Sequence, residues 1–258
     1  MKLKWYGTAM VLIEHEGTHL LFDPFFSLND KLFKPSFDEF TAVENIFVTH
    51  GHFDHIAGIP DIIKLNKKAK VFCTTSPQKT LISKGVEEKR IFEIKPGDVL
   101  NIEPFEVRVL KGKHVVFDMK IIIKTLCNLG LLTQWRNLRY ILRENKLCAE
   151  AGETVIYEIN AAGKRMLLLG SLNLDKNIDY PKNVDLLILP FQGRSDIIKY
   201  AISFINHLHP KNVLLNHFTD TFPPISSEVK TEPFVSQMWL YYPNIPVICP
   251  KAGVEWGI

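Results

Sequence analysis

The chain has 258 residues, of which 46% are hydrophobic and 23% charged, a composition that excludes wholesale disorder and fibrous repeats. Its 31 Lys and Arg against 28 Asp and Glu give a net charge of +3, too small a surplus to indicate nucleic acid as the partner. The four cysteines are scattered without CxxC spacing, so the sequence suggests neither a zinc knuckle nor a disulfide framework and favours a cytoplasmic protein.

The first quarter of the chain predicts strands followed by a helix. Residues 2–6, 10–15 and 19–22 are short β-favouring segments separated by turns, which predicts an antiparallel meander. The apolar segment that starts at residue 45 predicts a strand ending at His50, and residues 56–65 favour a helix. The N-terminus lacks a secretory pattern, and no apolar stretch approaches the ~20 residues that a membrane-spanning helix requires.

The remaining elements repeat this alternation of strands and helices. Strands are predicted at 70–73, 90–94, 105–110, 154–159, 165–170, 184–190 and 213–217, with two more between 244 and 258. Helices are predicted to begin at Ser76-Pro77 and to cover 195–208, with Ser195 as the cap. Because no linker divides the chain, we expect one domain over 1–258, an α/β protein with an αββα sandwich of two sheets.

A cluster of potential metal ligands ends the strand near residue 50. The segment THGHFDH places His50, His52, Asp54 and His55 within six residues. On an extended strand end residues two apart share a face, so His50 and His52 can point at one ion while the turn directs Asp54 and His55 to another. A lone histidine is usually an ordinary surface residue, but this spacing predicts a site for one or two Zn²⁺ ions, with Mn²⁺ or Fe²⁺ as alternatives.

This HxHxDH segment resembles the motif of the metallo-β-lactamase fold superfamily, and the resemblance covers nearly the whole chain. The segments WYGTAMVLIE and LLFDPFF are similar to the branch that includes ascorbate-6-phosphate lactonases and N-acyl-phosphatidylethanolamine phospholipase D. The resemblance implies a four-layer sandwich of two mixed sheets flanked by helices. It also implies a metal-dependent hydrolase.

The resemblance further implies the remaining ligands. His114 would complete the first metal site and His217 the second, with a purely structural histidine as the alternative at each position. The bridging aspartate of the family follows a glycine, but here the pair reads Gly170-Ser171. We therefore expect one tight ion and a weaker second one, because a neutral hydroxyl leaves two cations less screened from each other. Asp175, or an anionic group of the substrate, would be the alternative bridge.

The expected chemistry is hydrolysis of a small ester, lactone or phosphodiester by a metal-bound hydroxide, because Zn²⁺ lowers the pKa of its water to about 7. Asp54 is the candidate catalytic residue as well as a ligand, since it can hold that water and accept its proton. Asp23, in FDPFF, is expected to orient a histidine ligand, with capping of a turn as the alternative.

A segment at about 119–150 has the character of a helical insertion. Trp135, Leu138 and Leu142 share one face of a predicted helix, and arginines lie on a neighbouring face. Between Met119 and Cys148 the only acidic residue is Glu144, and six residues are basic: Lys120, Lys124, Arg136, Arg139, Arg143 and Lys146. One interpretation is a lid whose apolar face covers the pocket, with Trp135 and Arg139 as candidate contacts to an anionic or lipid-like substrate. The basic side chains of such a lid could also meet a lipid surface or a partner subunit, for example in a homo-oligomer. The plainer interpretation is a packed helical excursion with a solvated basic face.

Smaller features and other function classes stay open. Gln192 and Arg194 are candidate substrate contacts, although a loop between a strand and a helix needs no function. His207 and His209 are expected to interact with a helix dipole rather than with metal. A metal-binding sensor or scaffold without turnover is an alternative motivated by Ser171. A nuclease is favoured by the basic insertion and opposed by the small net charge.

Overall fold

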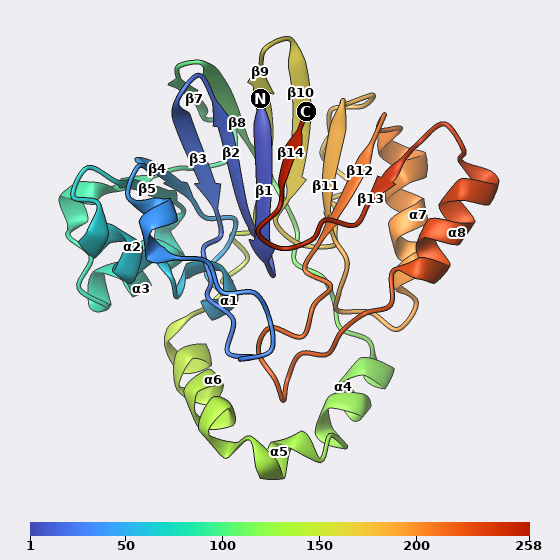
Figure 1. The fold of residues 1–258 in the computed structure, drawn as a ribbon, viewed down its shortest axis with the longest axis horizontal. Coiled ribbons are helices and arrows are strands. Elements are labelled where there is room, and N and C mark those ends of the chain that lie inside the picture. The colour runs from blue at the N-terminus through green and yellow to red at the C-terminus, as the bar shows by residue number, and fades with distance from the viewer.

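Two seven-stranded β-sheets lie face to face in the computed structural model, which describes all 258 residues (Figure 1). The first sheet contains, in spatial order, β14 (Glu255–Gly257), β1 (Lys2–Gly7), β2 (Met10–His15), β3 (Thr18–Phe22), β4 (Asn45–Phe47), β5 (Lys70–Cys73) and β6 (Ile91–Glu93). The second sheet contains β13 (Val247–Ile248), β12 (Val213–Asn216), β11 (Leu186–Pro190), β10 (Lys164–Leu169), β9 (Val155–Ala161), β8 (Phe105–Lys111) and β7 (Val99–Ile102).

Both sheets are mixed, as expected. In the first sheet the strands from β14 to β3 are antiparallel, with Leu3 opposite Ile13, and those from β3 to β6 are parallel. In the second sheet the strands from β7 to β10 are antiparallel and those from β10 to β13 are parallel. Strands β8, β10, β11 and β12 therefore run in one direction, and the segments that follow them meet at one edge of the sandwich.

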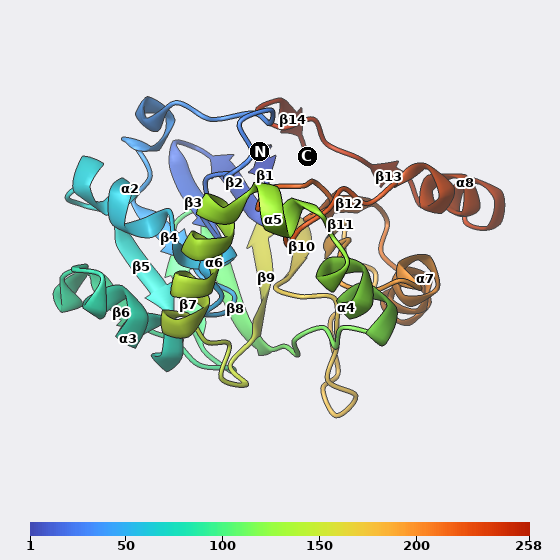
Figure 2. The same ribbon diagram turned by 90° about the horizontal axis from the view of Figure 1, so that it is seen from below.

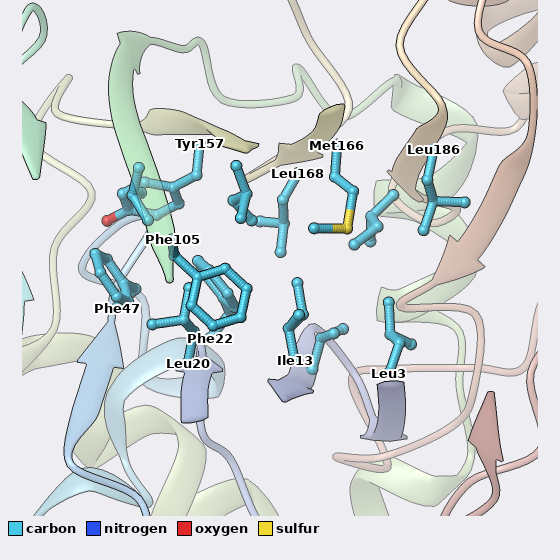
Figure 3. Close-up of a cluster of buried hydrophobic side chains, with 14 of the residues drawn as sticks. Leu3, Ile13, Leu20, Phe22, Phe47, Phe105, Tyr157, Met166, Leu168 and Leu186 are labelled. Carbon is cyan, nitrogen blue, oxygen red and sulfur yellow. The ribbon is translucent and has the colours of Figure 1, made fainter. Parts of the chain in front are cut away.

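The layer between the sheets is apolar because alternate residues of each strand face it. Figure 3 shows Ile13 and Phe22 of the first sheet facing Leu168 and Tyr157 of the second. All four side chains are buried. The Phe22 ring also stacks on Phe47, with a centroid distance of 5.2 Å. This layer joins the two sheets into one core.

Helices cover the outer face of each sheet. Ile62 of α2 (Ile59–Leu65) and Leu81 of α3 (Thr75–Ser83) are buried in one cluster with Val71 of the first sheet. Ile205 of α7 (Ile197–Leu208), together with residues of α8 (Glu232–Tyr241), joins the cluster behind the second sheet. The remaining short helices on this body are η1 (Phe37–Phe40), α1 (Phe53–Ile56) and η2 (Glu88–Arg90). The four-layer αββα prediction is thus confirmed.

Residues 119–148 form an arch of three helices, α4 (Met119–Leu126), α5 (Gly130–Thr133) and α6 (Trp135–Leu147), below the sandwich in Figure 1. Seen from below, the arch passes across the edge where both sheets end (Figure 2). A hydrogen bond from the Ser195 backbone N–H to the Asp118 carboxylate attaches the start of the arch to the sandwich. A hydrogen bond of 2.7 Å from the Asn128 side-chain amide to the Pro224 carbonyl attaches its middle. Its end is held by an ion pair between Glu144 and Lys84.

Several elements differ from the sequence expectation. The predicted helix over 56–65 is divided into α1 and α2, and α8 and β7 were not predicted. Ser195 is not the cap of α7: the helix begins one residue later, after Asp196, and no side chain caps it. The Asp196 carboxylate is instead engaged by Arg194. No helix combines the length and apolar character needed to cross a membrane.

Candidate metal centre

Two groups of potential ligands lie at the edge where the strands end. Within each group the ligand atoms lie within 4.8 Å of one another. The first group is His50, His52 and His114, and the second is Asp54, His55 and His217. Residues 50–55 follow β4, whereas His114 follows β8 and His217 directly follows β12. The direction of these strands therefore brings together side chains that lie far apart in the sequence, as His50 and His114 do in the first group and His55 and His217 in the second.

Two glycines allow the backbone to come close at this edge. A Cβ on Gly51, within the HxHxDH segment, would lie 2.2 Å from the Ala149 carbonyl oxygen, so only glycine fits beneath the end of the arch. A Cβ on Gly170 would lie 2.5 Å from the Thr49 Cβ. The glycine that precedes Ser171 thus lets β10 approach the segment that carries His50.

Hydrogen bonds hold two of the rings by Nδ1, so that Nε2 points toward the other candidate ligands. The His114 Nδ1–H donates to the Val115 carbonyl at 2.9 Å. The His217 Nδ1–H donates to the Gln192 side-chain oxygen at 2.7 Å. A ring nitrogen that donates a hydrogen bond leaves the other nitrogen unprotonated in the neutral ring, and that nitrogen is the one able to bind a metal.

Asp23 organises two further rings through buried hydrogen bonds. Its carboxylate accepts from the Thr49 backbone N–H at 2.8 Å, from the Thr49 hydroxyl at 2.7 Å and from His55 Nδ1 at 2.9 Å. Because the Thr49 hydroxyl donates to Asp23, it accepts from His50 Nδ1 at 3.0 Å. This leaves Nε2 of both His50 and His55 facing the site. Asp23 directly follows β3, with a positive φ of 48°, and its side chain contacts a candidate ligand as the first of its two expected roles requires.

His52 presents the opposite ring nitrogen. Its Nδ1 lies 3.1 Å from the His50 Nε2, and its ring centroid lies 4.6 Å from that of His114. The proton of His50 is on Nδ1, so its Nε2 offers a lone pair toward His52. Three imidazoles that converge in this way suit one divalent cation of the Zn²⁺, Mn²⁺ or Fe²⁺ type. The donor set of the first group therefore fits a metal ion.

Electrostatics keep the first group in the neutral form that metals require. Burial, reinforced by the neighbouring histidines, lowers the pKa of His50 well below its usual value. Burial and His52 lower the pKa of His114 to about 4. Burial also lowers the pKa of His52. All three rings are therefore neutral at neutral pH, each with one unprotonated nitrogen.

The second group carries the negative charge of the site. The Asp54 Oδ2 lies 3.1 Å from His217 Nε2 and 3.8 Å from His55 Nε2. Burial opposes ionisation of Asp54, but His55 and His217 outweigh it and hold its pKa well below the usual range. Burial likewise opposes protonation of His55, yet Asp23 and Asp54 raise its pKa. A carboxylate and two imidazoles that face one another in this way are the donor types that suit a second divalent cation.

Neither candidate bridging residue belongs to these groups. The Ser171 hydroxyl accepts a hydrogen bond from the Val115 N–H at 3.0 Å, so it supports the segment that carries His114. The Asp175 carboxylate pairs with Lys111 at 3.2 Å and accepts from the Asn177 N–H. In this arrangement the Asp175 carboxylate is engaged by Lys111 and Asn177 and does not lie between the two ligand groups.

Gln192 and Arg194, the candidate substrate contacts, are both engaged by the protein itself. The Gln192 amide accepts from His217 and donates to the Ser227 carbonyl at 3.1 Å. The Arg194 guanidinium pairs with Asp196, donates to the Val116 carbonyl and lies over the Tyr200 ring. Gln192 thus orients a candidate ligand, a role that the sequence did not indicate because the contact joins two separate loops.

Trp135 and Arg139 lie on the exposed side of α6 and make no hydrogen bond or ring contact with the site. Trp135 is 57% exposed, and Leu142 on the same face is 54% exposed. The expectation that this face covers the pocket is therefore wrong. The face that turns inward carries Ile141 and Glu144, both buried.

Thr49 is the site residue that the sequence analysis missed, and its position directly before His50 was the available signal. His207 and His209 lie at the end of α7 and belong to neither ligand group, and His209 adopts the left-handed conformation that ends the helix.

Comparisons with known proteins agree with this arrangement. A family model described as a β-lactamase superfamily domain matches residues 18–218. The chain is 25% identical over 256 residues to a UPF0173 protein of Pyrococcus furiosus, a match that covers 99% of this chain and 100% of that protein. A UPF0173 metal-dependent hydrolase of Ligilactobacillus salivarius is 24% identical over 234 residues, or 89% of this chain and 90% of that one. The solved structure of Igni18, a metallo hydrolase of Ignicoccus hospitalis, has a TM-score of 0.65 at 17% identity and covers 100% of this chain and 98% of that chain, which shows the fold alone.

Proposed function

The chain belongs to the β-lactamase superfamily as a metal-dependent hydrolase, and we propose that it cleaves a small ester, lactone or phosphodiester at the two ligand groups. The observation that carries this proposal is the convergence of Nε2 of His50, Nδ1 of His52 and the ring of His114 beside the ionised Asp54. A bound divalent ion would acidify water to a pKa of about 7 and polarise a carbonyl or phosphoryl oxygen.

The side chains of the first group would hold and orient the cation. Three neutral imidazoles would bind a divalent ion without neutralising its charge, so that the ion could act as a Lewis acid on water or substrate. The hydrogen bonds that hold the rings of His50 and His114 keep the metal-binding nitrogens aimed inward before any ion arrives, which reduces the cost of assembling the site.

Asp54 acts on the proton of the attacking water. Its carboxylate is ionised at neutral pH, so it accepts a hydrogen bond from water and fixes the direction of attack. A proton accepted by Asp54 would pass on to the leaving group or to solvent. We therefore assign Asp54 both a ligand role and a proton-handling role, as the sequence suggested.

Ser171 supports a site with one tight and one weaker ion. A hydroxyl occupied by the Val115 N–H supplies no negative charge between two cations. An anionic group of the substrate would then complete the bridge between the two ions. A phosphodiester or a phosphorylated lactone carries such a group. Both substrates are in keeping with the lactonase and phospholipase D-like branch that the sequence resembles. The four free cysteines support a cytoplasmic setting.

The same Ser171 favours a second candidate, a sensor or scaffold that binds metal without turnover. The two candidates differ in whether any substrate is consumed. The test combines elemental analysis of the purified protein with a screen of generic lactones, esters and phosphodiesters.

The variant His52→Ala removes a ring of the first group, and His207→Ala, at an exposed histidine outside both groups, is the matched control. We expect His52→Ala to lose bound metal and metal-dependent turnover, and His207→Ala to keep both. Bound metal without turnover of any substrate class would favour the sensor. Turnover that survives both His52→Ala and chelation would refute the proposal.

A further inference from the structure

The arch of residues 119–148 exposes an unusual amount of apolar surface. Of the 22 large hydrophobic residues that are exposed in the whole protein, nine lie on these 30 residues. The most exposed are Leu126, Leu129 and Leu132, at 70%, 78% and 80%. Exposed apolar side chains that gather on one element mark a binding surface more often than isolated ones do.

These leucines lie at the outermost part of the molecule on the side of the metal centre. Leu129 and Leu132 belong to the first turn of α5 and its cap, and Leu126 ends α4. Figure 1 shows α5 as the lowest element, with the sandwich above it, and Figure 2 shows α4, α5 and α6 following one another across this side. Nothing in the protein covers the three leucines.

The charge on the arch is one-sided. Six of the 31 basic residues of the chain lie here, against one of its 28 acidic residues. That acid, Glu144, is buried and already paired with Lys84 and Arg143. The exposed surface of the arch therefore combines apolar tips with five basic side chains, all except Arg143, that have no acidic partner.

We propose that the arch docks on an anionic phospholipid surface. Leu126, Leu129 and Leu132 would enter the boundary between headgroups and acyl chains, Trp135 would lie at the interface, and the basic side chains would contact anionic headgroups. A second copy of the chain fits this face less well, because self-association would bring two sets of unpaired cations together. An anionic lipid surface satisfies both the apolar and the basic groups.

The two ends of the arch lie close to the ligand groups. Phe117, just before α4, has its ring 6.0 Å from that of His114, and Tyr140 of α6 lies 6.5 Å from Phe53, the neighbour of Asp54. Docking would therefore turn the metal centre toward the lipid. Binding to the surface needs neither metal nor turnover, so it can be tested separately from the hydrolase proposal.

The first experiment uses a polarity-sensitive fluorophore on Cys127, which is exposed at the end of α4, in a Cys249→Ser background that removes the other exposed thiol. The metal-free and metal-loaded proteins are titrated with vesicles of phosphatidylcholine alone or with phosphatidylglycerol added. We expect a blue shift and saturable binding with the anionic vesicles, weaker by about fivefold for each basic side chain neutralised, as in Arg136→Gln. Absence of binding to anionic vesicles at low salt would overturn the proposal.

The second experiment removes the apolar tips. We expect Leu129→Ser with Leu132→Ser to weaken vesicle binding by about tenfold or more, because two leucine side chains no longer enter the lipid. The matched control, Trp239→Ser with Leu240→Ser, changes residues of α8 that are 78% and 61% exposed, and it should bind as the unaltered protein does. Equal loss in both variants would overturn the proposal. So would a dimer, seen by sedimentation, that the leucine variant dissociates.

Discussion

Replacing Asp23 with asparagine tests how the site is held before any metal binds. The Asp23 side chain is 1% exposed and accepts three hydrogen bonds, two of them on the same oxygen. In Asp23→Asn, the amide oxygen can still accept the hydrogen bond from the Thr49 backbone N–H. The NH₂ group that replaces the other oxygen cannot accept the hydrogen bonds from the Thr49 hydroxyl and from His55 Nδ1. Each buried donor left without an acceptor costs about 1–3 kcal/mol, so we expect a loss of about 2–6 kcal/mol.

The assay is thermal unfolding in the presence of a chelator, which removes any contribution from bound metal. For a chain of this size about 1 kcal/mol corresponds to roughly 2–4 °C, so the midpoint should fall by about 5–20 °C. Asp61→Asn, at a half-exposed carboxylate that pairs with Lys64 on α2, is the control and should shift it by about 1–2 °C at most. If Asp23→Asn unfolds at the same temperature as the unaltered protein, the buried network does not stabilise the site and the reasoning is refuted.

Three further predictions concern the ligands and the thiols. Ser171→Asp should raise the metal content toward two ions, because a carboxylate would screen the two cations; unchanged stoichiometry by elemental analysis would contradict this. Gln192→Ala should weaken metal binding about 10–100-fold, measured by competition with a chelator, because the His217 ring loses the contact that orients it; equal affinity would show that Gln192 is dispensable. Burial raises the pKa of the Cys73 thiol to about 12, so alkylation at pH 8 should modify the exposed Cys127 and spare Cys73, and mass spectrometry that finds both modified at equal rates would contradict the structure.

The sandwich could be predicted from the sequence because its strands carry local signals. The alternation in residues 10–15 and 19–22 and the turn between them specify a hairpin, and the structure has it as β2 and β3. The edge strand β7 was missed because its four residues are only half-buried or exposed, so they lack the strong apolar alternation of the inner strands. The helix α8 was missed because apolar residues on it face both the core and solvent, as the buried Met238 and the exposed Trp239 show.

The candidate site could be predicted only in part. His50 to His55 are contiguous, so their spacing alone indicated a shared ion. His114 and His217 required the resemblance to a family, since nothing local distinguishes them from other histidines that follow a strand. The contact of Gln192 with His217 depends on how two loops meet, and no local pattern encodes it.

The orientation of α6 was predicted wrongly for a physical reason. The helix has two apolar stripes, and the one with Trp135 and Leu142 is the more hydrophobic by composition. The stripe that turns inward contains Ile141 but also Glu144, whose burial is stabilised by Lys84 from α3's C-terminal end. A helix pattern read alone cannot identify an ion pair with a residue sixty positions earlier.

The most direct test of the central claim is anomalous X-ray scattering from crystals grown with Zn²⁺. We expect a peak at about 2.0–2.1 Å from Nε2 of His50, Nδ1 of His52 and Nε2 of His114, with a second, weaker peak near Asp54 and His217. Crystals soaked in excess Zn²⁺ that show no peak among the first three rings would contradict the account.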